Sequence, residues 1–142
     1  MSGGAKGNWK VIELRGLVTA FYENEKKHQE GSQANFERRN IAELDFSNKI
    51  LPFSNFCAVY ALKCGFQKSD LSHALFSDAF LQGADFSNSN LTNVDFSRSN
   101  LQNVKFVDAN LSGCDFENCN LRGANFEGAK MDETRFPGVI LL

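Results

Sequence analysis

The fold is decided by residues 84–128, which read in blocks of five ADFSN SNLTN VDFSR SNLQN VKFVD ANLSG CDFEN CNLRG ANFEG. The third residue of each block is alternately Phe and Leu, the first is small, and the second is Asn or Asp in all but one block. An α-helix repeats its buried positions every 3.6 residues and a strand every 2. A period of five fits neither element and indicates a chain that turns a corner after each block.

The repeat extends far beyond this stretch. Apolar residues hold every fifth position from Phe36 to Leu141, and 11 of the 14 Phe stand there ten residues apart, with Ile, Leu, Ala or Met between them. A second register, two positions earlier, holds only small residues from Ser54 to Val139 but fails at Arg39, Leu44 and Lys49. We expect the large side chains to fill the interior, with a predicted core of Phe56, Phe66, Phe76, Phe86, Phe96, Phe106, Phe116, Phe126, Leu71, Leu81, Leu91, Leu101, Leu111 and Leu121.

Blocks such as 84–88, 109–113 and 124–128 resemble the A(D/N)LXX unit of the pentapeptide-repeat proteins. The resemblance covers about residues 34–142. It implies an all-β solenoid, a right-handed quadrilateral β-helix of about five coils with four five-residue faces in each coil. Residues 20 apart then stack, about 4.8 Å apart, and two opposite walls present Phe ladders.

The composition sets further limits. With 142 residues, 42% hydrophobic and 23% charged, the chain has the balance of one globular domain. No apolar run approaches the roughly 18–20 residues that cross a bilayer, and the N-terminus does not resemble a secretory signal, so we expect a cytoplasmic protein without membrane contact. A net charge of −2 argues against a nucleic-acid partner.

Residues 1–33 precede the repeat as a separate N-terminal segment. Within residues 9–29, apolar residues follow helical spacing, which predicts a capping helix over the exposed end of the solenoid. Gly16 weakens this interpretation, and residues 10–14 are also compatible with a short strand.

The sequence predicts no catalytic, cofactor-binding or metal site. Cys64, Cys114 and Cys119 fall in the small inward register, where a thiol is apolar filler, whereas Cys57 is expected to point outward. His28 and His73 are isolated in the sequence. The repeated acids Asp85, Asp95 and Asp115 are expected to bond backbone groups at the corners instead of acting as general acids.

Outward apolar residues are rare, so two groups of them stand out. The first is Tyr60, Leu62 and Phe80, which share one wall, with Leu75 around the corner. It is either covered by the N-terminal segment or receives a partner protein. The second group is the C-terminal end, with Phe136, Ile140 and Leu142, where a homodimer is one interpretation and fraying is the other. The resemblance implies a dimer through that end, because pentapeptide-repeat proteins that inhibit gyrase dimerise through their C-terminal ends. In those proteins the end is usually a longer helical segment, which this chain lacks.

Two functions follow as hypotheses. The first is a non-catalytic interaction module that presents flat solenoid faces to a protein partner. The second, implied by the resemblance, is a DNA mimic that inhibits or protects a type II topoisomerase such as gyrase. The 13 acidic and 10 basic residues between Glu37 and Arg135 are too balanced for a convincing phosphate mimic, so the first hypothesis is favoured.

Overall fold

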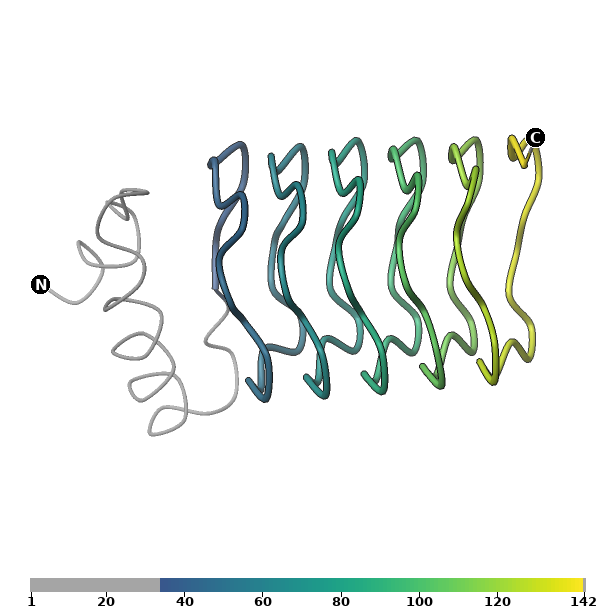
Figure 1. Ribbon diagram of the computed structural model, residues 1–142, viewed down its shortest axis with the longest axis horizontal. Coiled ribbons are helices and arrows are strands. Elements are labelled where there is room, and N and C mark those ends of the chain that lie inside the picture. The colour runs from purple at the N-terminus through teal and green to yellow at the C-terminus, as the bar shows by residue number, and fades with distance from the viewer. Residues whose placement is uncertain (1–33, 142) are drawn as a thin grey trace, which may run out of the picture.

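The computed structural model describes residues 34–141, which wind into a rod of stacked coils (Figure 1). Every β-bridge is parallel and joins a residue to the residue 20 positions later, from Asn35↔Asn55 to Asn120↔Ile140. One coil therefore takes 20 residues, or four blocks of five. Over residues 34–141 the strand pairing consists of these isolated bridges, one per block, and contains no longer strand.

The rod is a right-handed quadrilateral β-helix, as predicted. Its four walls are named here by their central residues. Wall 1 carries Phe36, Phe56, Phe76, Phe96, Phe116 and Phe136, and wall 2 carries Ile41, Ala61, Leu81, Leu101, Leu121 and Leu141. Wall 3 carries Phe46, Phe66, Phe86, Phe106 and Phe126, and wall 4 carries Leu51, Leu71, Leu91, Leu111 and Met131. The first coil keeps the same pairing in spite of Arg39, Leu44 and Lys49. The predicted capping helix over residues 9–29 lies outside the described residues.

Each corner is a β-turn, and at most corners a backbone hydrogen bond closes it. At the first corner, for example, the N–H of Arg39 donates to the carbonyl oxygen of Phe36 at 3.0 Å. The third residue of the turn has positive φ at every corner, including Phe53 at 62° and Ala58 at 54°. A positive φ at this position is the mark of a type II turn, which favours Gly or Asn there. Pro52 and Pro137 occupy the second position of their turns, where proline is favoured.

Phenylalanine rings fill the interior from walls 1 and 3. Along each wall the rings stack, as between Phe56 and Phe76, whose centroids are 4.6 Å apart with an interplanar angle of 1°. Across the axis they meet edge to face, as between Phe76 and Phe86 at 5.6 Å and 89°. Both arrangements are favourable for aromatic quadrupoles. The structure buries Leu71, Leu81, Leu91, Leu101, Leu111 and Leu121 and the Phe residues from Phe36 to Phe116 on the repeat.

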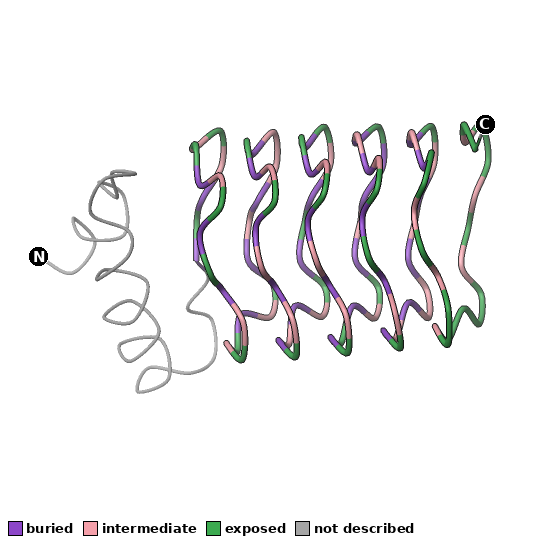
Figure 2. Ribbon diagram, in the orientation of Figure 1, coloured by how far each residue is buried: buried purple, intermediate pink, exposed green. Residues whose placement is uncertain are grey.

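The last coil departs from this pattern (Figure 2). Phe126, expected in the core, is only partly buried, and so is Phe136, while Met131 is 41% and Leu141 is 60% exposed. The reason is that among the described residues no coil stacks on their far side.

Candidate interaction surface

Asn and Asp side chains at the second position of the blocks form hydrogen bonds with the backbone. In 13 blocks the Oδ1 atom of the second residue accepts a hydrogen bond from the backbone N–H two residues later, as from Ser87 to Asp85 at 2.9 Å. Asp85, Asp95 and Asp115 all make this bond, which confirms the backbone hydrogen bonds predicted for these acids. These Asx turns bind the outward N–H groups that the coil pairing leaves over. The three acidic side chains thus stabilise the turns.

The small register contains hydrogen-bond donors as well as filler. The thiols of Cys64, Cys114 and Cys119 donate to the carbonyl oxygens of Ile41, Leu91 and Phe96, at 2.7–2.9 Å. Burial raises the pKa of each of these thiols to about 12. They are therefore protonated at neutral pH and are poor nucleophiles. Cys57 is half-buried, with its Sγ 3.3 Å from Ser77 Oγ.

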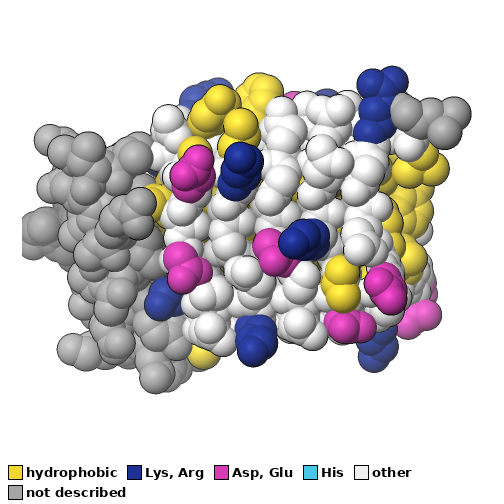
Figure 3. Space-filling model, viewed as in Figure 1, with side chains coloured by type: hydrophobic (Ala, Val, Ile, Leu, Met, Phe, Trp, Pro, Cys, Tyr) yellow, Lys and Arg dark blue, Asp and Glu magenta, His cyan; other side chains and the backbone are white. Residues whose placement is uncertain are grey.

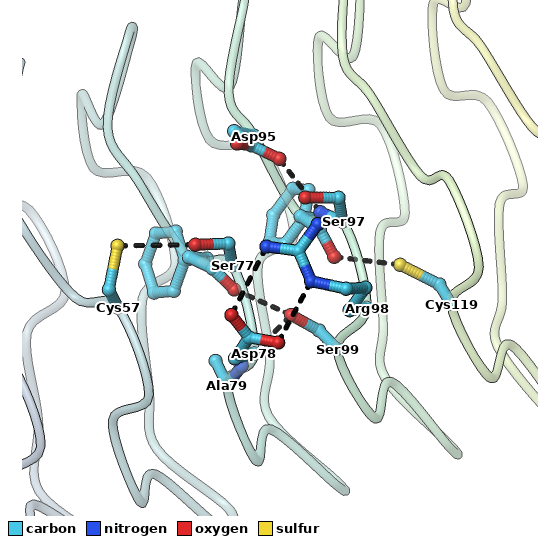
Figure 4. A network of polar contacts seen from close by, with 11 residues as sticks. Cys57, Ser77, Asp78, Ala79, Asp95, Ser97, Arg98, Ser99 and Cys119 are labelled. Atoms are coloured by element: carbon cyan, nitrogen blue, oxygen red, sulfur yellow. Dashed lines mark hydrogen bonds and ion pairs between the residues drawn. The ribbon is translucent and has the colours of Figure 1, made fainter.

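The charged side chains of wall 1 are partly paired (Figure 4). Arg98 donates to both carboxylate oxygens of Asp78, at 3.0 and 3.2 Å, and Arg135 donates to Asp115 at 2.9 Å. The hydrogen bonds from Arg98 lower the pKa of Asp78. Both ion pairs join residues in adjacent coils, and Arg135 follows Asp95 and Asp115 in one column of wall 1.

The first predicted apolar group is present on the surface. We call Tyr60, Leu62, Leu75 and Phe80 the Tyr60–Phe80 patch. Tyr60, Leu75 and Phe80 are 45%, 42% and 47% exposed, and Leu62 is half-buried. The rings of Tyr60 and Phe80 lie in adjacent coils of wall 2, with centroids 6.0 Å apart, and Leu75 lies on wall 1. Figure 3 shows hydrophobic side chains gathered over the first coils and at the C-terminal end.

A second exposed pair lies near the patch. Phe53 is exposed, and its ring stacks on His73 with centroids 4.7 Å apart and an interplanar angle of 7°. Both residues sit at the corner between wall 4 and wall 1, two positions before the wall-1 residues Asn55 and Leu75. His73 is isolated in the sequence but has an aromatic neighbour in space. Ile50, also exposed, lies on wall 4.

At the predicted dimer end, Ile140 is 46% exposed on wall 2 and Phe136 is half-buried, stacked on Phe116 at 5.1 Å. Leu142 lies outside the described residues. In the described residues, no group of three or more His, Cys, Asp or Glu side chains is placed to hold a metal ion. No helix among the same residues has the length and hydropathy of a membrane span.

A solenoid of stacked five-residue blocks, with a filled interior and Asx-closed edges, defines a class of repeat protein. The sequence model for pentapeptide repeats matches residues 69–106 and 105–141, in 8 copies. The chain belongs to the pentapeptide-repeat family, whose members are generally non-catalytic repeat proteins. No curated protein sequence matches it.

One solved structure shows the same fold, and others are similar to parts of the chain. QnrB1, a plasmid-mediated fluoroquinolone resistance protein, superposes with a TM-score of 0.56 at 20% identity, over 74% of this chain and 63% of that chain. Rfr23 from the cyanobacterium Cyanothece 51142 has a TM-score of 0.47 at 19% identity, over 87% and 99% of the two chains. A pentapeptide repeat protein of the Arabidopsis thaliana thylakoid lumen has a TM-score of 0.42 at 29% identity, over 73% and 62%. The chain thus spans less than two thirds of the Arabidopsis chain and of this particular QnrB1 chain.

Proposed function

We propose that this chain is a non-catalytic protein-interaction module and that its partner binds the Tyr60–Phe80 patch. One observation carries the proposal. In the column that holds Tyr60 and Phe80, the blocks before and after carry Asn40, Asn100 and Asn120, each of which closes an Asx turn. Two consecutive coils thus replace a stabilising polar residue with an exposed aromatic one. The fold gains no core packing from this exchange, so a binding role explains it best.

The size of the patch is consistent with this role. An aromatic side chain buries about 150–250 Å² when it is fully covered. With nearly half of three large side chains exposed, the patch leaves on the order of 300 Å² of apolar surface for a partner, in the range typical of functional patches on monomers. Beside the patch, wall 1 carries the Asp78–Arg98 and Glu37–Arg38 ion pairs. Charged residues around an apolar centre are typical of the polar rim of a protein interface.

The chemistry of the polar residues supports a non-catalytic module. The recurrent acids are engaged in Asx turns, and three of the four thiols have a raised pKa. The interior along the rod is occupied by contacting aromatic rings. A reaction would need titratable groups gathered in a concave site, and flat walls do not favour one.

The test is affinity capture from the native organism with matched variants. Tyr60→Asn and Phe80→Asn restore the residue that the same column carries elsewhere, so both variants should fold. Lys105→Asn makes the same change at the same block position on wall 3 and serves as the control. We expect one partner to be retained by the wild type and by Lys105→Asn and lost by the two patch variants. A partner retained by all four proteins would place the binding site elsewhere.

The topoisomerase hypothesis receives less support. The likeness to QnrB1 concerns the fold, and the bridge series over residues 35–140 runs without a projecting loop. Arg98 and Arg135 also neutralise acids on wall 1. Unchanged gyrase supercoiling at micromolar protein would dispose of this hypothesis.

We further propose that the end carrying Phe136, Met131, Ile140 and Leu141 associates with a second copy. The support is that three of these large side chains are exposed by more than 40%. Light scattering of the wild type and of Ile140→Ser should give a dimer and a monomer respectively, and equal masses would contradict the proposal.

A further inference from the structure

The Tyr60–Phe80 patch also lacks the hydrogen-bond acceptors that Asn and Asp side chains supply in other blocks. Where Tyr60, Leu75 and Phe80 replace Asn or Asp, the Asx oxygen is missing as well. The outward N–H groups of Leu62, Ser77 and Gln82 consequently have no hydrogen-bond acceptor among residues 34–141. The same holds for Gln67, Val107 and Asp132, which follow Gly65, Lys105 and Lys130. Gln67 and Val107 have no exposed large apolar side chain beside them, and Asp132 lies beside Met131 in the last coil. Exposed apolar groups and open N–H donors therefore coincide at the patch.

Two of these donors lie side by side on wall 2. Leu62 and Gln82 are 20 residues apart, in adjacent coils of the parallel ladder, so their N–H groups are separated by about 4.8 Å. In the next two coils of the same column, Asn100 and Asn120 supply acceptors to Gln102 and Arg122 at 3.1 and 3.2 Å. These two Asn side chains thus show where an acceptor oxygen lies at this block position and at what distance it accepts a hydrogen bond from the backbone N–H.

A third polar group at this place also lacks a partner. The side-chain oxygen Oε1 of Gln82 is buried and has no hydrogen-bond donor in the described part of the chain. A buried acceptor without a donor costs about 1–3 kcal/mol. Peptide segments carry both kinds of group, because each residue has an N–H and a carbonyl oxygen.

The charge of the wall favours an acidic partner. Among residues 34–141, wall 2 carries three basic side chains (Arg39, Lys63 and Arg122) and one acidic side chain (Glu43). Lys63 follows Leu62 directly and forms no ion pair with a described residue. Its Cγ lies 3.3 Å from the point where a Cβ on Gly83 would be, so the side chain extends along the wall towards the Gln82–Gly83 turn.

We propose that the Tyr60–Phe80 patch binds a partner segment in which apolar side chains alternate with acidic ones. This inference rests on the proposed function. The apolar side chains of the segment pack on Tyr60 and Phe80, and its oxygens accept hydrogen bonds from the N–H groups of Leu62 and Gln82. The partner thereby supplies the acceptors that Asn side chains supply elsewhere in the column. Lys63 adds an attraction for the acidic side chains that salt screens.

The test uses synthetic peptides and the amide resonances of the 15N-labelled full chain. The probe is a 12-residue peptide of alternating Leu and Asp with Ser spacers. One control peptide replaces Asp with Lys, and a second replaces Leu with Ser. We expect the acidic apolar peptide to shift the amide signals of Leu62 and Gln82, and both control peptides to bind at least tenfold more weakly. Lys63→Gln should weaken binding several-fold and reduce its dependence on salt.

The double variant Tyr60→Asn/Phe80→Asn should lose the interaction, while Lys105→Asn keeps it. Acidic and basic apolar peptides that bind the patch equally would overturn the inference and leave the proposed function intact. Shifts confined to other residues, or no binding at millimolar peptide, would also overturn it. The capture experiment decides the proposed function separately. Signals of residues 1–33 that change together with those of Leu62 and Gln82 in the free double variant would assign the patch to the N-terminal segment and refute the inference.

Discussion

Replacing Phe86 with Leu should destabilise the rod much more than the same change at its end. The ring of Phe86 is fully buried. It stacks on Phe66 and Phe106 at 4.8 and 5.5 Å and meets Phe76 and Phe96 edge to face, both at 5.6 Å. Aromatic pairs contribute about 0.5–1.5 kcal/mol each beyond the area they bury. Losing four pairs that share one ring should cost roughly 2–4 kcal/mol, allowing for incomplete additivity.

Phe136→Leu provides the comparison. Phe136 has two ring contacts, to Phe116 at 5.1 Å and Phe126 at 6.2 Å, and it is partly exposed in the last coil. Its replacement should cost about 1 kcal/mol or less, because a terminal coil can open without the rest of a repeat array. Leu101→Met, a change of similar volume on a wall whose inward side chains carry no rings, should cost less than about 1.5 kcal/mol.

The assay is urea unfolding followed by circular dichroism, with the slope of the transition compared between variants. A changed slope would report that the coils no longer unfold together. Equal losses for Phe86→Leu and Phe136→Leu would refute the idea that ring contacts along the axis hold the coils together. A loss below about 1 kcal/mol for Phe86→Leu would refute the magnitude.

Three further predictions concern the corners, the thiols and the acids. Gly83 and Gly113 have φ of 73° and 75°, so an Ala at either position should cost about 1–2 kcal/mol of stability. Gly113→Ala should cost more than Gly83→Ala, because its Cβ would meet the Asn93 side chain. Equal urea midpoints for the two variants would contradict this prediction. A thiol reagent at pH 8 should label Cys57 quickly in the folded chain and all four cysteines after denaturation, and rapid labelling of Cys57→Ser would contradict the burial of the others. Hydrogen bonds from Ser47 and from Arg98 lower the pKa of Asp45 and of Asp78, so the stability they provide is fully present above their ordinary pKa of 3.8 and is lost as the pH falls through the lowered values. The variant Asp45→Asn/Asp78→Asn should therefore lose less stability between pH 5 and pH 3 than the wild type, as measured by urea midpoints.

Most of the fold could be predicted from the sequence because each block repeats the same physical requirements. A large apolar residue every fifth position defines the interior, and Asn or Asp before it defines the turn oxygen. The family resemblance supplied the handedness and the four walls, which a period of five does not contain. Phe126 was expected among the buried residues and is only partly buried, since burial at the end of a rod depends on a neighbouring coil instead of on the block itself.

Other features were hidden because they arise between coils. Type II geometry at Phe53 and His73 could not be inferred from residue types that seldom adopt positive φ; the repeat imposes it. The bonds from buried thiols to carbonyl oxygens 23 residues earlier depend on stacking. The open N–H groups of Leu62 and Gln82 had a signal in the sequence, namely the loss of Asn from one column at Tyr60 and Phe80. That signal has meaning only after the Asx turns of the other blocks are known.

The unbroken 20-residue pairing has a consequence for how such a chain can change in length. Inserting one residue would move every later inward side chain to the outside, whereas inserting one block of five would preserve the core. Such a block would also turn everything beyond it by a quarter revolution about the long axis. Twenty inserted residues would lengthen the rod by one coil and keep the orientation of both halves. The distance and the angle between two surface features are thus set by how many blocks separate them.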